Sequence, residues 1–192
     1  MEIWKSDLHR VLTGQWLDDH IVDYVLVMLK DQTGRSDVSI QLSSFGTQIQ
    51  SPNIDIRNLQ QEIRGDYKEC KFALLPISNN VHWYLAAIDY VSHEIFVMCS
   101  LNGMYDTVAR NLQRIFETNG ASDDFRVFYP KVPKQMNGRD CGVFVIMSAK
   151  ALMLQVKKTF EVSWEKLVDA NNVESNGRTA IRDLIMSQLH EK

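Results

Sequence analysis

Length, composition and charge exclude several classes of protein. The chain has 192 residues, 45% of them hydrophobic and 23% charged, which is typical of one globular domain with its own apolar core. Its net charge of −3, without basic runs interleaved with aromatic residues, argues against nucleic acid as a partner. No stretch approaches the roughly 20 apolar residues needed to span a bilayer, so the sequence predicts no membrane partner either.

The predicted elements follow in chain order from the spacing of apolar residues. Apolar side chains at helical spacing predict an amphipathic helix over residues 18–30, with Asp18 or Asp19 as its N-cap. Residues 31–69 are polar with weak periodicity, and we interpret them as a connecting region that contains a short helix at 56–63. The later elements are strands at residues 71–77, 83–90, 94–98 and 125–129 and helices at residues 107–118, 142–154, 164–171 and 178–190.

The helix predicted at residues 142–154 is apolar on all sides, which indicates a helix buried at the centre of the domain. Strands cluster in the middle of the chain, and no internal repeat or linker divides it. The sequence therefore predicts a single domain over residues 1–192, of α+β class.

The cysteines and the N-terminal residues indicate the compartment. Cys70, Cys99 and Cys141 are odd in number and widely spaced, which suits neither a disulfide framework nor a zinc site. The first residues lack the basic and apolar regions of a secretion signal. We therefore expect an intracellular protein with free thiols.

The segment QMNGRDCG at residues 135–142 places Cys141 after a tight turn, at the start of the buried helix. Backbone N–H groups at a helix N-terminus stabilise a thiolate, which is the form of cysteine that attacks a carbonyl. Gln135, upstream in the same loop, could donate its amide to the oxyanion that forms. The alternative is that Cys141 is only a small buried apolar residue, as most free cysteines are.

A second segment supplies the base that a nucleophilic cysteine needs. His82 stands at the start of an apolar strand, after the turn at Asn79-Asn80 and directly before Trp83. An imidazole in that place can face a cleft, with the adjacent aromatic ring forming one of its walls. The pair of segments therefore favours a reactive Cys141 with His82 as its base.

His-Trp at the start of a strand, followed far downstream by Gln-x-Asn-Gly-x-Asp-Cys-Gly, resembles the Ulp1/SENP cysteine proteases. The segment from Trp16 to Asp19, Trp-Leu-Asp-Asp, is similar to the Trp-Leu-Asn-Asp of that family. These matches span residues 16–154. The resemblance implies a papain-like fold, with a central mixed sheet flanked by helices, and cleavage after the Gly-Gly terminus of a ubiquitin-like protein. It assigns Cys141 as nucleophile, His82 as base and Gln135 as oxyanion donor.

The same resemblance implies a set of substrate-binding residues. Trp16 and Trp83 would form the narrow tunnel for the Gly-Gly tail, and Asp19 would face a basic residue of the partner. Asn137 and Gly138 of the nucleophile loop are assigned to substrate binding as well. Without the resemblance, we would interpret both tryptophans as core residues and Asp19 as the cap of a helix.

One position departs from the family pattern. Where the family has a histidine-orienting aspartate in a segment like Asp-Ser-Leu, this chain has Cys99, seventeen residues after His82. A hairpin at residues 90–93 would bring Cys99 close to the imidazole, but a neutral thiol carries no charge to stabilise an imidazolium. Asn102 or Asp106 could compensate, depending on loop geometry. Asp89 lies too far along the strand to do so.

Three functional hypotheses follow. The first is an active protease for a ubiquitin-like modifier, with SUMO as the first candidate and NEDD8 or ubiquitin as the others. The second is a catalytically impaired module that binds a ubiquitin-like protein, because Cys99 replaces the expected aspartate. The third is an acyltransferase on the same fold. In each case we expect a monomer in the nucleus or cytoplasm that needs neither a metal nor another cofactor.

Overall fold

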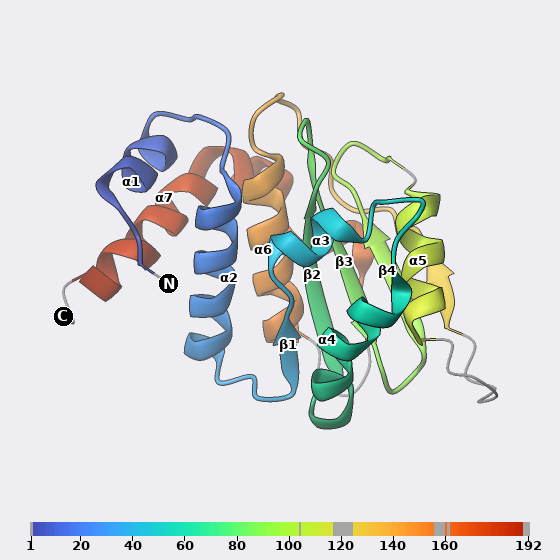
Figure 1. Ribbon diagram of the computed structural model, residues 1–192. Helices are drawn as coiled ribbons and strands as arrows, with labels where there is room; N and C mark the ends of the chain where they lie inside the picture. The colour runs from blue at the N-terminus through green and yellow to red at the C-terminus, as the bar shows by residue number, and fades with distance from the viewer. Residues whose placement is uncertain (1, 104, 117–124, 156–159, 161, 190–192) are drawn as a thin grey trace.

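A mixed sheet of five strands forms the middle of the molecule (Figure 1). The computed structural model describes residues 2–103, 105–116, 125–155, 160 and 162–189, and of residues 62–68, 188 and 189 it describes only the backbone. The strands lie in sequence order, with β1–β2 and β4–β5 parallel and the two central pairs antiparallel. They are β1 (Val38–Ile40), β2 (Phe72–Ser78), β3 (Trp83–Asp89), β4 (Glu94–Met98) and β5 (Arg126–Phe128).

Helices cover both faces of the sheet (Figure 1). One face packs against α2 (Asp19–Thr33) and α6 (Cys141–Gln155), with α7 (Ala170–Leu189) and α1 (Lys5–Leu12) outside them. The other face carries α3 (Ser43–Gln48), α4 (Ile56–Glu69) and α5 (Asp106–Phe116). A 3-10 turn, η1 (Trp164–Lys166), precedes α7. The predicted α+β architecture of a mixed sheet flanked by helices is therefore confirmed.

The strands β2 and β3 are apolar except at their last residues, because both of their faces are buried. Along β2, Phe72 and Leu74 point into the core beneath α2 and α6, whereas Ala73 and Leu75 point into the core beneath α3 to α5. This alternation follows from the two-residue repeat of a strand. A strand that is buried on both faces therefore has a continuous run of apolar residues in the sequence, and such runs predict the central strands.

The hairpin between β3 and β4 places the end of β4 opposite the start of β3. Leu85 pairs with Met98, and Asp89 pairs with Glu94. Asp89 is fully buried, and its carboxylate accepts hydrogen bonds from the backbone of the turn at Val91 and of Phe160. Asp89 therefore stabilises the far end of the hairpin, away from the end at which Cys99 lies, as predicted.

Three short elements were not predicted. The first is α1, in the first residues of the chain, and the others are β1 and α3, both within the segment interpreted as a connection. The helix predicted at residues 56–63 extends to Glu69 as α4. Because β1 has three residues and α3 has six, neither is long enough to produce a readable hydrophobic period.

The prediction of two separate C-terminal helices is wrong, because α7 is continuous from Ala170. Gly177, which lies between the two predicted helices, is inside α7. A Cβ at this position would stand 2.6 Å from a methyl carbon of Val143, so glycine lets α7 pack closely on α6. The other predicted helix, over residues 164–171, shrinks to η1 because the Asp169 side chain accepts from the backbone N–H of Asn171 and begins α7 instead.

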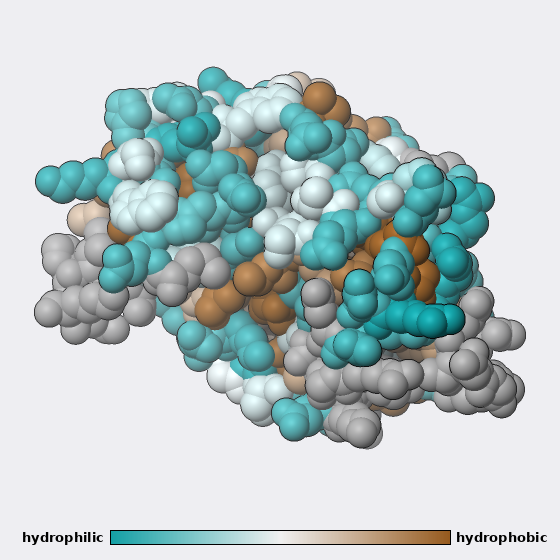
Figure 2. Space-filling view, in the orientation of Figure 1, coloured by the Kyte–Doolittle hydropathy of each residue, from teal (hydrophilic) through white to brown (hydrophobic). Residues whose placement is uncertain are grey.

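The exterior agrees with a core enclosed between the sheet and its helices. On the face shown in Figure 2, hydrophilic residues predominate, and hydrophobic residues show as small groups between them. None of the helices in the described part of the chain is both long and apolar enough to cross a membrane.

Candidate active site

Cys141 is the first residue of α6, and its side chain is 2% exposed. Burial raises the pKa of the thiol above the usual value of 9.0, although backbone hydrogen bonds from Trp83 and Gly142 to the sulfur act in the opposite direction. Cys141 is therefore a protonated thiol at neutral pH whose thiolate, once formed, already has donors in place. Chemistry at this sulfur requires a neighbouring base.

His82 is held close to that sulfur through its chain neighbour Trp83. It directly precedes Trp83, the residue whose backbone contacts Cys141, and a turn in which Asn80 has a φ of +68° leads the chain into this position. The His82 ring is buried, and burial lowers its pKa below the usual 6.5. The imidazole is therefore neutral at physiological pH and able to accept a proton.

Cys99 lies on the other side of the imidazole. Its sulfur is 3.2 Å from Nε2 of His82, so the proximity predicted from the hairpin is confirmed. The backbone N–H of Leu101 also points at this sulfur, at 3.3 Å, and the Tyr105 hydroxyl lies 3.7 Å away. Cys99 thus occupies a position surrounded by hydrogen-bond donors, which is the environment that a carboxylate would use fully.

Neither of the residues considered as substitutes for the missing aspartate contacts the imidazole in the described hydrogen bonds. Asp106 accepts instead from the Tyr129 hydroxyl at 2.8 Å. Burial is the larger cause and this hydrogen bond the next cause that raise the pKa of Tyr129 to about 12. Asn102 adopts a φ of +57° in a turn that its own N–H closes on the carbonyl of Cys99. His82 therefore has Cys99 as its orienting neighbour.

Gln135 is buried and fixed in orientation by two contacts. The Ser100 hydroxyl donates to its Oε1 at 2.6 Å, and its Nε2 donates to the carbonyl of Asn137 at 2.7 Å. Since a carbonyl can only accept, the amide nitrogen must face the nucleophile loop. Among the described residues, the second N–H of that nitrogen has no acceptor. Ser100 was missed by the sequence analysis, although it directly follows Cys99.

The C-terminal helix holds the nucleophile loop in place. Arg178 of α7 donates from Nε to the carboxylate of Asp140 at 2.7 Å, and the other oxygen of Asp140 accepts from the Asn137 side chain at 2.8 Å. One turn earlier, the Glu174 carboxylate accepts from the backbone N–H groups of Met136 and Asn137. The residue before the nucleophile is therefore anchored by a helix that the sequence analysis did not connect to the site.

We expect Arg178→Gln to lower the free energy of unfolding by about 3 kcal/mol, because it leaves the buried Asp140 carboxylate without its ion pair. Arg182→Gln is the matched control one turn later, since Arg182 pairs with Asp183 at the surface, and its effect should stay within about 0.5 kcal/mol. Urea unfolding of both variants measures the difference. Equal effects would show that the Asp140 pair does not anchor the loop.

A cleft of about 370 Å³ opens beside Trp83. The predicted binding residues Trp16, Asp19 and Trp83 all line it, so the fold brings together segments that are far apart in the sequence. The indole N–H of Trp16 donates to the carbonyl of Gly138 at 3.1 Å, and that of Trp83 donates to the carbonyl of Leu17 at 2.9 Å. Both rings are therefore fixed at the cleft next to the nucleophile loop.

The structure adds two details to these predictions. Asn137 and Gly138 do not line this cleft, and the side-chain oxygen of Asn137 accepts from the N–H of Asp140 within the nucleophile loop, so their part in substrate binding stays a prediction. Asp18, rather than Asp19, caps α2 by accepting from the N–H of Ile21 at 3.1 Å. The Asp19 carboxylate is therefore exposed at the cleft, bound only to the N–H of His20 among the described contacts.

A thiol at the N-terminus of a buried helix, beside a neutral imidazole on a mixed sheet, defines the class of cysteine-nucleophile hydrolases. Residues 15–183 match the model of the Ulp1 protease family, C-terminal catalytic domain. Because the match covers most of the chain, the chain belongs to the Ulp1 protease family, a family of cysteine peptidases. The resemblance inferred from the sequence is thus confirmed.

Individual relatives agree with this assignment. The chain is 27% identical over 167 residues to ubiquitin-like-specific protease 1A of Arabidopsis thaliana, in a match that covers 76% of this chain and 33% of the relative. This chain therefore spans about a third of the length of that relative.

Solved structures share the fold. One described as a de-sumoylating protease superposes with a TM-score of 0.80 at 18% identity, over 98% of this chain and 87% of the other. The C-terminal Ulp1 protease domain in complex with Smt3, the yeast ortholog of SUMO, gives 0.75 at 19% identity, over 96% and 83%. At these identities the likeness supports the fold alone.

Proposed function

We propose that this chain is a cysteine protease that cleaves after the Gly-Gly terminus of a ubiquitin-like modifier, during precursor processing or release from a lysine side chain. The observation that carries the proposal is the placement of Cys141, at a helix N-terminus beside His82 and next to the cleft of Trp16 and Trp83. SUMO is the preferred modifier, since a structural relative was solved with Smt3 and another is described as de-sumoylating. NEDD8 and ubiquitin are the other candidates.

The first chemical step would move the Cys141 proton to His82. The thiolate then attacks the carbonyl carbon of the terminal glycine, and the resulting oxyanion receives a hydrogen bond from the free amide N–H of Gln135. The protonated His82 gives its proton to the departing amine, the C–N bond breaks, and a thioester remains on Cys141. Water, activated by His82, hydrolyses that thioester and restores the thiol.

The cleft explains why a Gly-Gly tail would be selected. The indole nitrogen of Trp16 donates to the carbonyl of Gly138, and that of Trp83 donates to the carbonyl of Leu17, the residue after Trp16, so the two rings are held to linked segments. A pair of glycines has no side chains to clash with two fixed indole rings. Asp19, exposed at the same cleft, can pair with a basic residue of the modifier.

A catalytically impaired binding module is the second candidate, and Cys99 is the observation that favours it. A thiol beside Nε2 of His82 stabilises the imidazolium less than a carboxylate does. That module would retain the cleft and bind the modifier without efficient turnover. The remaining expectations, a single domain over residues 1–192, a monomer, and a nuclear or cytoplasmic location, stay predictions.

Mechanism-based labelling tests the proposal. The purified chain is incubated with SUMO, NEDD8 and ubiquitin that carry thiol-reactive groups at the C-terminus, and mass spectrometry locates the adduct. Selective labelling of Cys141 by one probe is expected, with SUMO as the preferred one. Absence of labelling by all three, together with measurable binding of an unmodified modifier, would favour the impaired module.

The pH dependence of turnover follows from the burial of His82. Burial disfavours the charged imidazolium and lowers the pKa of His82, so the neutral base persists as the pH falls through 6.5. We expect the acidic limb of kcat/KM to have its midpoint below pH 6.5. A pH–rate profile with a small fluorogenic amide of the modifier measures it. A midpoint above 6.5 would mean that a nearby anion stabilises the imidazolium.

A further inference from the structure

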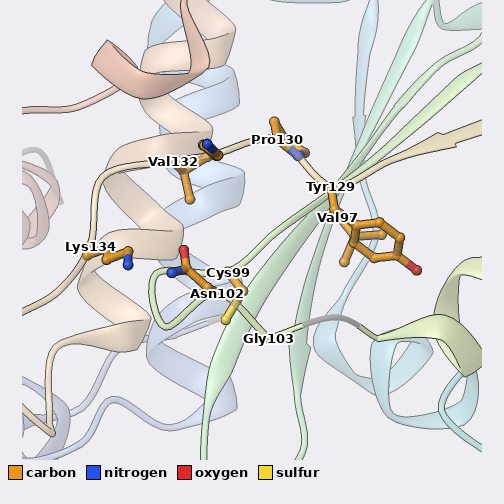
Figure 3. A pocket seen from close by; sticks show the side chains of 9 residues that line it. Val97, Cys99, Asn102, Gly103, Tyr129, Pro130, Val132 and Lys134 are labelled. Atoms are coloured by element: carbon orange, nitrogen blue, oxygen red, sulfur yellow. The ribbon is translucent and has the colours of Figure 1, made fainter.

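A second cavity, which shares no lining residue with the tryptophan cleft, lies beside the residue that contacts His82. It has a volume of about 460 Å³ and opens beside Cys99 at the end of β4. Figure 3 shows Lys134, Asn102 and Cys99 around one end of this cavity and Tyr129 at the other. Its remaining lining residues are Val97, Gly103, Pro130, Lys131 and Val132.

The proposed reaction indicates which part of the substrate lies near this cavity. The imidazole that takes the proton from Cys141 must return it to the departing amine, so the leaving group lies on the imidazole side of the nucleophile. The backbone of Trp83 contacts the sulfur of Cys141, and the sulfur of Cys99 contacts Nε2 of His82, the residue before Trp83. The cavity beside Cys99 is thus reached by a leaving group that extends past His82.

The tryptophan cleft and the cavity beside Cys99 differ in the charged residues that line them. The tryptophan cleft is lined by Asp18 and Asp19, whereas no carboxylate lines the cavity beside Cys99 and two lysines do. Lys131 and Lys134 are both exposed, and neither forms an ion pair with any acid in the described part of the chain. Their ammonium groups are therefore available to an anionic group from outside the chain.

We propose that this cavity is a leaving-group subsite that binds an acidic side chain near the modified lysine of a conjugate. Lys131 and Lys134 supply the positive charge, and the amide of Asn102 supplies a further polar contact at the cavity wall. The inference rests on the proposed function, because in an isopeptide substrate the polypeptide that carries the modified lysine lies on this side. It predicts selectivity among conjugates, a property that the tail cleft cannot provide, since the tail is the same in all of them.

The experiment compares leaving groups that differ only in charge. SUMO, or whichever modifier labels Cys141, is joined through its C-terminus to the lysine of short peptides with Glu, Gln or Lys two residues after the acceptor. We expect the Glu peptide to be cleaved about twofold to fivefold faster than the Gln peptide in kcat/KM, as one exposed ion pair allows. The ratio should shrink in high salt because these charges are exposed to solvent.

Charge reversal provides the decisive variant. In the double variant Lys131→Glu with Lys134→Glu, the preference should move from the Glu peptide to the Lys peptide. The matched control changes the exposed Lys5 and Lys166 to Glu, which alters the net charge equally at other sites and should keep the wild-type ratio. Equal rates for the Glu and Gln peptides, or an unchanged preference after charge reversal, would overturn the subsite.

A small neutral leaving group separates the two proposals. The same modifier with a C-terminal aminocoumarin amide reports cleavage without any peptide in the cavity. If wild-type protein fails to release aminocoumarin, the proposed function itself fails. If it releases aminocoumarin but shows no charge preference among the peptides, the proposed function stands and the subsite is rejected.

Discussion

Cys99→Asp is expected to raise kcat/KM by about tenfold to a hundredfold. Loss of the corresponding carboxylate costs about 10⁴ in the serine-protease template, and the gain should be smaller here because the Cys99 sulfur already contacts Nε2 of His82. The new carboxylate would accept from His82 and from the N–H of Leu101, which now points at the sulfur. Its charge would stabilise the imidazolium that forms during proton transfer. Steady-state cleavage of the aminocoumarin amide measures the change.

The pH profile separates an electrostatic gain from a change in packing. A carboxylate raises the pKa of His82, so the acidic limb of Cys99→Asp should move to higher pH than that of the unaltered chain. Cys99→Asn is the matched control, because it has the shape of aspartate without the charge and should leave the limb in place. An unchanged rate and limb in Cys99→Asp would mean that another group already orients His82.

Cys141→Ala is expected to abolish turnover, with a loss of about 10⁶ in kcat as when other catalytic nucleophiles are removed. Binding of the modifier should change by no more than about twofold, because the cleft of Trp16 and Trp83 is built from other elements. Calorimetry with the unmodified modifier measures binding, and the aminocoumarin assay measures turnover. Residual turnover near the original rate would exclude Cys141 as nucleophile.

Two further variants control for the buried position of Cys141. Cys141→Ser keeps the size of the side chain and should also lose turnover, which rules out a cavity as the cause. Cys70→Ser alters a thiol at the start of β2 that contacts the Ser36 carbonyl at 3.8 Å, far from the imidazole along the sheet. Its turnover should equal that of the unaltered chain.

The sequence alone was sufficient wherever a short segment determines its own structure or chemistry. Continuous apolar runs identified the central strands and α6, because burial on all sides leaves few polar positions. The hairpin length placed Cys99 beside His82, since strand pairing fixes which residues lie opposite each other. The nucleophile loop and the residue before Trp83 indicated the chemistry through their residue types.

Only the tertiary structure decided the contacts between segments that are distant in sequence. The anchoring of Asp140 by Arg178, the orientation of Gln135 by Ser100, and the lysines at the cavity beside Cys99 depend on how separate elements pack. Such contacts leave no local period, because each partner is an ordinary polar residue in its own segment. The sequence could therefore identify the reactive groups, while the packing of α7 and of the loop after β5 determined what holds and surrounds them.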